Sequence, residues 1–335
     1  MCPLPSRGSH RCNLFSTVAA LAVICVAPAA RAQPVPPEVI ATLRDVVGNR
    51  IEAAVILAGD QGVSGGTFSQ VSAGTAPRSV SAKVTKLGGA GDAGHKQPIG
   101  DLPLRWQPRF QGSIGYLTAT NNFHSGTLDG DESDNKAFAV QLGGGARLWF
   151  DDHFSFAPTV AAMYGHLKND YTAHSAFAQA NLADFRELGL VDWTADTWTI
   201  IPGVDVRYVF SCSRAEFKLS SDFAYYYTQS FEASNPNLTV GGSSETWKNI
   251  VEADIPTEIE LFGRELRTGG SFSRTEFFGD VRTGLDTGHM YQFHGRLVLD
   301  LIGLWKMKWL GLGGSYIWGD NFHAWTFGAD VTLKL

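Results

Sequence analysis

The sequence predicts an all-β protein, namely a closed antiparallel transmembrane β-barrel of about 12 strands with a short N-terminal helix. Three observations support this prediction: an export signal at the start, long runs of alternating apolar and polar residues, and connections that alternate between short and long. After the export signal no stretch of about 18 apolar residues occurs, which excludes a helical membrane protein. Only helices and closed barrels satisfy every backbone hydrogen bond in lipid, so a membrane form of this chain must be a barrel.

The start of the chain has the organisation of a secretory signal peptide. Two arginines precede an apolar stretch over residues 14–27, and the triplet that ends at Ala32 offers small residues for cleavage. We therefore expect residues 1–32 to be removed. Three of the four cysteines would leave with this peptide, so only Cys212 would remain and no intramolecular disulfide could form.

The charge balance argues against a nucleic-acid partner. The chain has 33 acidic and 27 basic residues, a net charge of −6, and it becomes more acidic once the arginines of the signal peptide are lost. No basic stretch is concentrated enough to hold a phosphate backbone.

Period-two alternation marks the strands. It is clearest in residues 325–335, and it recurs in residues 138–150, 198–210, 217–227 and 291–301. These runs exceed the usual length of about five or six residues in globular proteins and are long enough to cross a bilayer when tilted. Ten strands are predicted between residues 106 and 335, and the β-rich residues 51–87 supply two more.

The predicted connections alternate in length. Short turns are expected at residues 151–153, 211–215, 256–257 and 303–307, and long loops at residues 121–135, 167–196, 228–242 and 276–288. Residues 88–101, rich in glycine and charge, are predicted to be a turn or loop. Outer-membrane barrels have short periplasmic turns and long extracellular loops, so the long loops should lie outside the cell.

Alternation alone does not decide which face points outward, because a soluble barrel places its apolar set inside. Charged and amide side chains in the polar set favour a wet or ion-paired lumen, and aromatic residues near strand ends suit interfacial girdles. The side chains predicted to face the lumen are Gln141, Arg147, Asp205, Arg207, Arg296, Asp300 and Lys334. These groups allow two interpretations, a conducting pathway or a structural ion-pair network, and the second is favoured because buried charges need partners.

Several segments carry a resemblance to a known family. They are residues 53–60 (AAVILAGD), 108–116 (PRFQGSIGY), 142–150 (LGGGARLWF) and 313–335. With them the chain, from about residue 51 onward, resembles the solitary outer-membrane autotransporter β-barrel domain. The resemblance implies a 12-stranded outer-membrane barrel that the barrel-assembly machinery inserts, with an N-terminal segment able to enter the pore.

The C-terminus departs from the family pattern. Such barrels usually end in an aromatic residue, whereas this chain ends in Leu335. The insertion signal is therefore assigned to Trp325, Phe327, Leu333 and Leu335 together. The short distance from Gln33 to the first β-like stretch leaves no room for a large secreted passenger, so none is expected.

Residues 33–50 are expected to form a separate N-terminal segment ahead of a barrel over residues 51–335. Within it, residues 37–48 place apolar side chains at helical spacing, and Gly48 follows as a stop signal. So short a helix is unstable alone in water and needs a partner surface. The resemblance favours a plug in the lumen, and the alternative is a periplasmic leader.

Two groups of loop residues could form chemical sites. The pairs His124-Ser125 and His174-Ser175 could belong to a lipid hydrolase, but no acid that would orient the histidine stands at a defined spacing. The acidic cluster Asp129, Asp131, Glu132 and Asp134 lacks the glycine of a standard calcium loop, so a solvated acidic loop is expected. No metal and no cofactor are predicted.

The sequence therefore predicts a non-enzymatic outer-membrane barrel of translocator type without a passenger. Its role would be that of a narrow pore or of a surface-exposed adhesion or assembly element. The alternatives are a small-solute channel of porin type and, less favoured, an outer-membrane lipid hydrolase. The expected partners are outer-membrane lipids, lipopolysaccharide and the barrel-assembly machinery.

Overall fold

The computed structural model describes residues 53–59, 66–72, 78–124, 128–238, 241–300, 307–320 and 322–333. The predicted signal peptide and the predicted helix at residues 37–48 lie outside the described residues and stay predictions.

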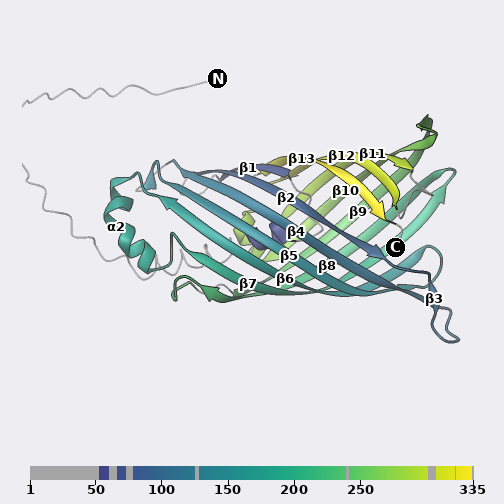
Figure 1. Ribbon diagram of the computed structural model, residues 1–335, viewed down its shortest axis with the longest axis horizontal. Coiled ribbons are helices and arrows are strands. Elements are labelled where there is room, and N and C mark those ends of the chain that lie inside the picture. The colour runs from purple at the N-terminus through teal and green to yellow at the C-terminus, as the bar shows by residue number, and fades with distance from the viewer. Residues whose placement is uncertain are drawn as a thin grey trace, which may run out of the picture. The chain divides into compact units, whose positions relative to one another are not determined.

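Twelve long antiparallel strands of the described chain form one closed sheet (Figure 1). Their bounds are β1 Gly66–Ser72, β2 Arg78–Asp92, β4 Arg105–Phe123, β5 Glu132–Trp149, β6 Phe154–Thr172, β7 Thr194–Cys212, β8 Ala215–Ala233, β9 Gly241–Leu261, β10 Arg264–Gly279, β11 His289–Asp300, β12 Met307–Gly319 and β13 Phe322–Leu333. Neighbours in sequence pair with each other, and the pairing of β1 with β13 closes the ring. The two-residue β3 (Gln97–Pro98) pairs with β4 beside it. The predicted barrel of about 12 strands is confirmed.

Three described segments are helical. α2 (Ala176–Glu187) lies in the β6–β7 connection, and α3 (Asp280–Leu285) follows β10. The third covers residues 53–59, within the stretch that was expected to supply two strands. β1 and β2 do supply those strands. Residues 53–59 contain three alanines and a leucine, which are good helix formers, and they are enclosed by the barrel. No helix in the described part of the chain is long and apolar enough to cross a membrane.

Most connections are short at one end of the barrel and longer at the other. Two depart from this rule: residues 93–104, between β2 and β4, form a long connection at the short-turn end, and the β12–β13 connection at the other end is very short. The predicted turn at residues 256–257 is wrong, because β9 continues to Leu261 and reverses at Phe262 and Gly263, both with positive φ (55° and 69°). Pro256 is tolerated inside β9 because pairing with β8 ends at Asp254, so this part of β9 has a ladder partner on one side only.

Two other predicted connections differ from the structure. Residues 88–92 belong to β2 rather than to a loop, since each pairs in register with β4. The long loops are shorter than predicted because the strands continue beyond their predicted ends; β6, for example, runs 19 residues to Thr172. Figure 1 shows α2 at one end of the barrel and β3 at the opposite end.

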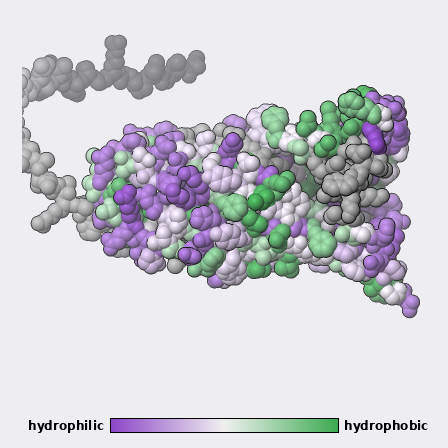
Figure 2. All heavy atoms as spheres, viewed as in Figure 1, coloured by the Kyte–Doolittle hydropathy of each residue, from purple (hydrophilic) through white to green (hydrophobic). Residues whose placement is uncertain are grey.

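Exposure alternates along the strands. In β6 the inward residues Ala161, Met163 and Leu167 are buried, whereas the outward Val160 and Tyr164 are exposed. In Figure 2 hydrophilic side chains dominate the end that carries α2, and hydrophobic ones lie on the wall between the two ends. An apolar outer wall around an interior that also holds buried charged and polar side chains, such as Arg147 and Asp205, is the arrangement of a membrane barrel.

Candidate functional site in the barrel lumen

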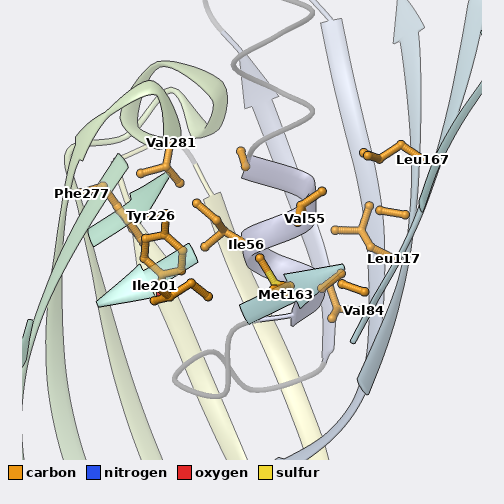
Figure 3. Close-up of a cluster of buried hydrophobic side chains, with 14 of the residues drawn as sticks. Val55, Ile56, Val84, Leu117, Met163, Leu167, Ile201, Tyr226, Phe277 and Val281 are labelled. Carbon is orange, nitrogen blue, oxygen red and sulfur yellow. The ribbon is translucent and has the colours of Figure 1, made fainter. Parts of the chain in front are cut away.

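The helix of residues 53–59 sits inside the barrel and packs on its inner wall (Figure 3). Its side chains Val55, Ile56 and Ala58 are each 1% exposed or less. The same apolar cluster includes Val281 of α3 and the wall residues Val84, Leu117, Met163, Leu167, Ile201, Tyr226 and Phe277. Because these residues come from many strands, the helix occupies the lumen rather than one wall.

Two wall glycines allow the helix to approach the sheet closely. A Cβ atom at Gly115 of β4 would overlap the backbone carbonyl of Ala58, and one at Gly165 of β6 would lie 2.9 Å from a methyl group of Val55. The hydroxyl of Ser113 also donates a hydrogen bond to the carbonyl of Gly59, near the C-terminal end of the helix. The wall is therefore shaped to hold the helix, and larger residues at these glycines would displace it.

A cluster of ion pairs lies in the lumen toward the end with the short turns. Its centre is Arg147, whose side chain is 0% exposed. The guanidinium lies 2.8 Å from Asp92 and 2.5 Å from Asp205, and it donates a hydrogen bond of 3.0 Å to the Ser155 hydroxyl. Three polar neighbours thus hold one buried cation, as burial of a charge requires.

Two more arginines complete this arginine cluster, which consists of Asp92, Arg109, Arg147, Asp205 and Arg207. Arg109 lies 3.0 Å from Asp92, and Arg207 lies 3.7 Å from both carboxylates. Each carboxylate therefore has more than one guanidinium within ion-pair distance.

A second ion-pair cluster faces the lumen from the next strands around the barrel, β8 to β11. Glu252 lies 2.7 Å from Lys218 and 2.9 Å from Arg296, and Asp254 lies 2.6 Å from Arg267 and 3.4 Å from Arg296. Arg296 therefore bridges two carboxylates that project from the same strand.

The other residues assigned to the lumen or to the insertion signal are placed as follows. Gln141 is buried, and its side-chain oxygen lies 3.3 Å from the Ser113 hydroxyl, beside the helix of residues 53–59. Trp325 and Phe327 are exposed on the outer wall of β13. Asp300 and Leu333 end β11 and β13, but their side chains lie outside the described set, as do the residues Lys334 and Leu335 entirely. The insertion role of the C-terminal residues stays a prediction.

The predicted lumen set includes four of the ten charged residues in these clusters and misses six. Asp92 was hidden in a glycine-rich stretch that was predicted to be a loop. Arg109, Glu252 and Asp254 stand at inward positions of strands, and strict period-two counting could have found them.

The loop residues weighed as a hydrolase or calcium site have structural roles. The Ser175 hydroxyl accepts the Ala178 backbone N–H as the N-cap of α2 and donates to Asp131. Asp131 also accepts backbone N–H groups of His174 and Ser175 and the hydroxyl of Tyr171. Asp131 is therefore buried, and the expectation of a solvated acidic loop is wrong for this residue.

Asp131 is ionised in this setting. Burial opposes ionisation, but the hydrogen bonds from Ser175, Tyr171 and His174 outweigh it and hold the pKa of the carboxyl below its ordinary value. Its oxygens are taken up by donors, so they are not arranged to ligate a cation. Among the described residues no group of His, Cys, Asp and Glu side chains has the geometry of a metal site, and Ser125 lies outside them.

Comparison with known proteins assigns the family. The family described as "Solitary outer membrane autotransporter beta-barrel domain" matches residues 101–325, which is most of the described barrel. The chain belongs to this family. It is thus an outer-membrane autotransporter barrel, as the resemblance in the sequence implied.

Solved autotransporter barrels are similar in fold. The transport unit of AIDA-I from Escherichia coli aligns with a TM-score of 0.50 at 11% identity, over 87% of this chain and 99% of that one. The β domain of the Bordetella autotransporter BrkA (TM-score 0.47, 16% identity, 81% and 100% covered) and the translocator domain of NalP from Neisseria meningitidis (0.48, 10%, 89% and 98%) are also similar. No curated protein matches the sequence. At these identities the structural likeness bears on the fold alone.

Proposed function

We propose that this autotransporter barrel is a non-enzymatic, translocator-type element whose lumen is closed at rest by its own helix, residues 53–59. The observation that supports this is the near-complete burial of Val55, Ile56 and Ala58 against the inner wall. A small-solute channel would need a continuous water-filled path, and a lumen of about 12 strands is narrow even before a helix enters it.

The charges of the lumen favour closure over conduction. In the arginine cluster every carboxylate lies within 4.0 Å of several guanidinium groups, so the charges are held by one another rather than presented to passing ions. Networks of this kind fix structure when all members are paired. A non-enzymatic role is supported by Ser175, whose hydroxyl is engaged as a helix cap.

Single-channel conductance in planar bilayers tests this proposal. The unmodified barrel should show little steady current. Val55→Asp places an unpaired charge in the apolar cluster, and Gly115→Val overlaps the helix backbone, so both should expel the helix and raise the conductance. Gly295→Val is the matched control, because a Cβ atom at that position of the outer wall meets nothing within 4 Å.

Folding of each variant is checked by its heat-modifiable mobility in electrophoresis. A large steady current through the unmodified barrel would contradict closure of the lumen. So would an unchanged conductance in both folded helix-displacing variants.

A further inference from the structure

Three lysines and a threonine form a row across the outer wall near the end with the long loops. Lys83 of β2, Thr118 of β4, Lys136 of β5 and Lys168 of β6 stand directly opposite one another in register. Each of these four residues has a sequence neighbour that is buried in the lumen, and these neighbours are Val84, Leu117, Ala137 and Leu167. Because side chains alternate across a strand, the four residues of this lysine row point outward.

The lysine row lies immediately above the apolar band of the wall. Along each strand toward the short turns, the next outward-facing residues are Thr85, Tyr116, Phe138 and His166. The outward-facing residues after those are Leu87, Ile114, Val140 and Tyr164. Most of these large side chains are exposed on the wall. One step in the other direction, all four residues are polar: Ser81, Thr120, Asp134 and Asp170. Aromatic residues mark the membrane interface, so the lysine row stands at the level of lipid headgroups.

The lysine row has fewer anionic partners than cations. Lys136 and Lys168 face each other directly, an arrangement that is destabilising for like charges. They share one carboxylate, that of Asp170, at 3.1 Å and 2.8 Å. Lys83 has no carboxylate within ion-pair distance in the described part of the chain. The side chains of Lys136 and Lys168 remain 42% and 47% exposed, so a further anion can reach them.

We propose that the lysine row binds the phosphate groups of lipid A, the anionic glycolipid of the outer leaflet. The long loops place this end of the barrel outside the cell, where lipid A forms the leaflet. Neighbouring strands lie about 4.8 Å apart, so Lys136 and Lys168 flank one anion while Lys83, about 10 Å away across β4, meets a second. The Thr118 hydroxyl lies between them as a hydrogen-bond donor, and the exposed apolar side chains below offer a surface for acyl chains.

Lipid A binding to the full chain, refolded from urea into detergent micelles and so free of native lipid, tests this proposal. The probes are lipid A and the same lipid without its phosphates. Each basic residue near an anionic lipid surface contributes about fivefold to binding. Because Asp170 already neutralises part of the row, the triple variant Lys83→Gln, Lys136→Gln, Lys168→Gln should raise the dissociation constant of lipid A at least about tenfold.

Two controls separate phosphate recognition from general lipid contact. Arg274→Gln removes an outward cation on β10 that is paired with Glu276, and it should leave lipid A affinity unchanged. Lipid without phosphates should bind the unmodified barrel and the triple variant equally weakly. High salt should weaken binding of lipid A to the unmodified barrel more than to the variant.

Equal affinity of the unmodified barrel and the triple variant for lipid A would overturn the proposal. It would also be overturned if the variant changed the oligomeric state but not lipid binding, because the row would then be a contact between copies. Should the triple variant fail to fold, Lys83→Gln alone decides, since it breaks no ion pair of the described residues and should weaken binding about fivefold. The row lies outside the lumen, so these results are independent of the conductance experiment.

Discussion

Replacement of Arg147 by leucine tests whether the arginine cluster stabilises the barrel. The guanidinium is fully buried and contacts Asp92, Asp205 and the hydroxyl of Ser155. Leucine has a similar apolar stem but no donors. The variant therefore leaves two carboxylates and one hydroxyl in the lumen with fewer partners, while it changes the packed volume little.

The expected magnitude follows from what remains around the two carboxylates. Removal of one partner from a buried ion pair costs roughly 3–5 kcal/mol. Arg109 still lies 3.0 Å from Asp92, and Arg207 still lies 3.7 Å from both carboxylates. We therefore expect a loss near the lower end, about 3 kcal/mol in the free energy of unfolding.

Unfolding by guanidinium in lipid vesicles, followed by tryptophan fluorescence, measures this loss. The control is Arg105→Leu, which breaks the exposed pair of Arg105 with Asp152 at 2.6 Å and should change the midpoint little. In the double variant Arg147→Leu, Asp205→Leu, part of the stability should return, because one carboxylate is removed with its partner. If Arg147→Leu proved no more damaging than Arg105→Leu, the cluster would not be a stabilising network.

Three further predictions concern the loops, the outer wall and the topology. Asp131→Ala should free the N-terminus of α2 and make the β6–β7 loop sensitive to protease, with the heat-modifiable mobility of the barrel unchanged. The pKa of Asp131 is held low, so the stability that its carboxylate gives the β6–β7 loop is complete above about pH 4. This stability is lost as the pH falls through the lowered pKa. Protease sensitivity of the unmodified loop should therefore rise only in stronger acid. Leu297→Arg, on an outward side chain that is 54% exposed, should cost roughly 2–4 kcal/mol of insertion stability in a refolding titration, whereas Leu102→Arg in a turn should cost far less. A cysteine introduced at Ala180 on α2 should react with a membrane-impermeant label on intact cells, and the native Cys212 at the opposite end should not; equal labelling would reverse or refute the topology.

The strand pattern was predictable because alternation is a local property of a two-faced sheet. The same reasoning could not assign the secondary structure of residues 53–59. A short apolar run fits a buried strand as well as a buried helix, and periodicity does not separate the two. The choice depends on the lumen, whose wall leaves room at Gly115 and Gly165 for a helix backbone. That room is created by strands distant in the sequence.

The sequence also could not predict which lumen side chains form ion pairs with one another. Inward positions of β5 and β7 identify Arg147 and Asp205 as polar lumen residues, but not as neighbours. Their contact depends on the register of three adjacent strands, since β6 lies between them. Asp92 joins them only because β2 runs five residues further than its glycine-rich sequence suggested.

The arginine cluster and the lysine row use different cations, and the chemistry of each side chain accounts for this. The arginine cluster needs a cation that serves several acceptors at once, and the planar guanidinium offers five donors and is weakly hydrated. The lysine row needs only a cation on a flexible stem that reaches the headgroup level, which lysine provides. Arg147→Lys should therefore destabilise the barrel nearly as much as Arg147→Leu in the same unfolding experiment, because one ammonium group cannot span Asp92, Asp205 and Ser155. Lys168→Arg should keep lipid A affinity, since phosphate accepts either cation. If Arg147→Lys were as stable as the unmodified barrel, a single point charge would be enough to hold the cluster. The planar, multidentate geometry of arginine would then not contribute to the stability of the barrel.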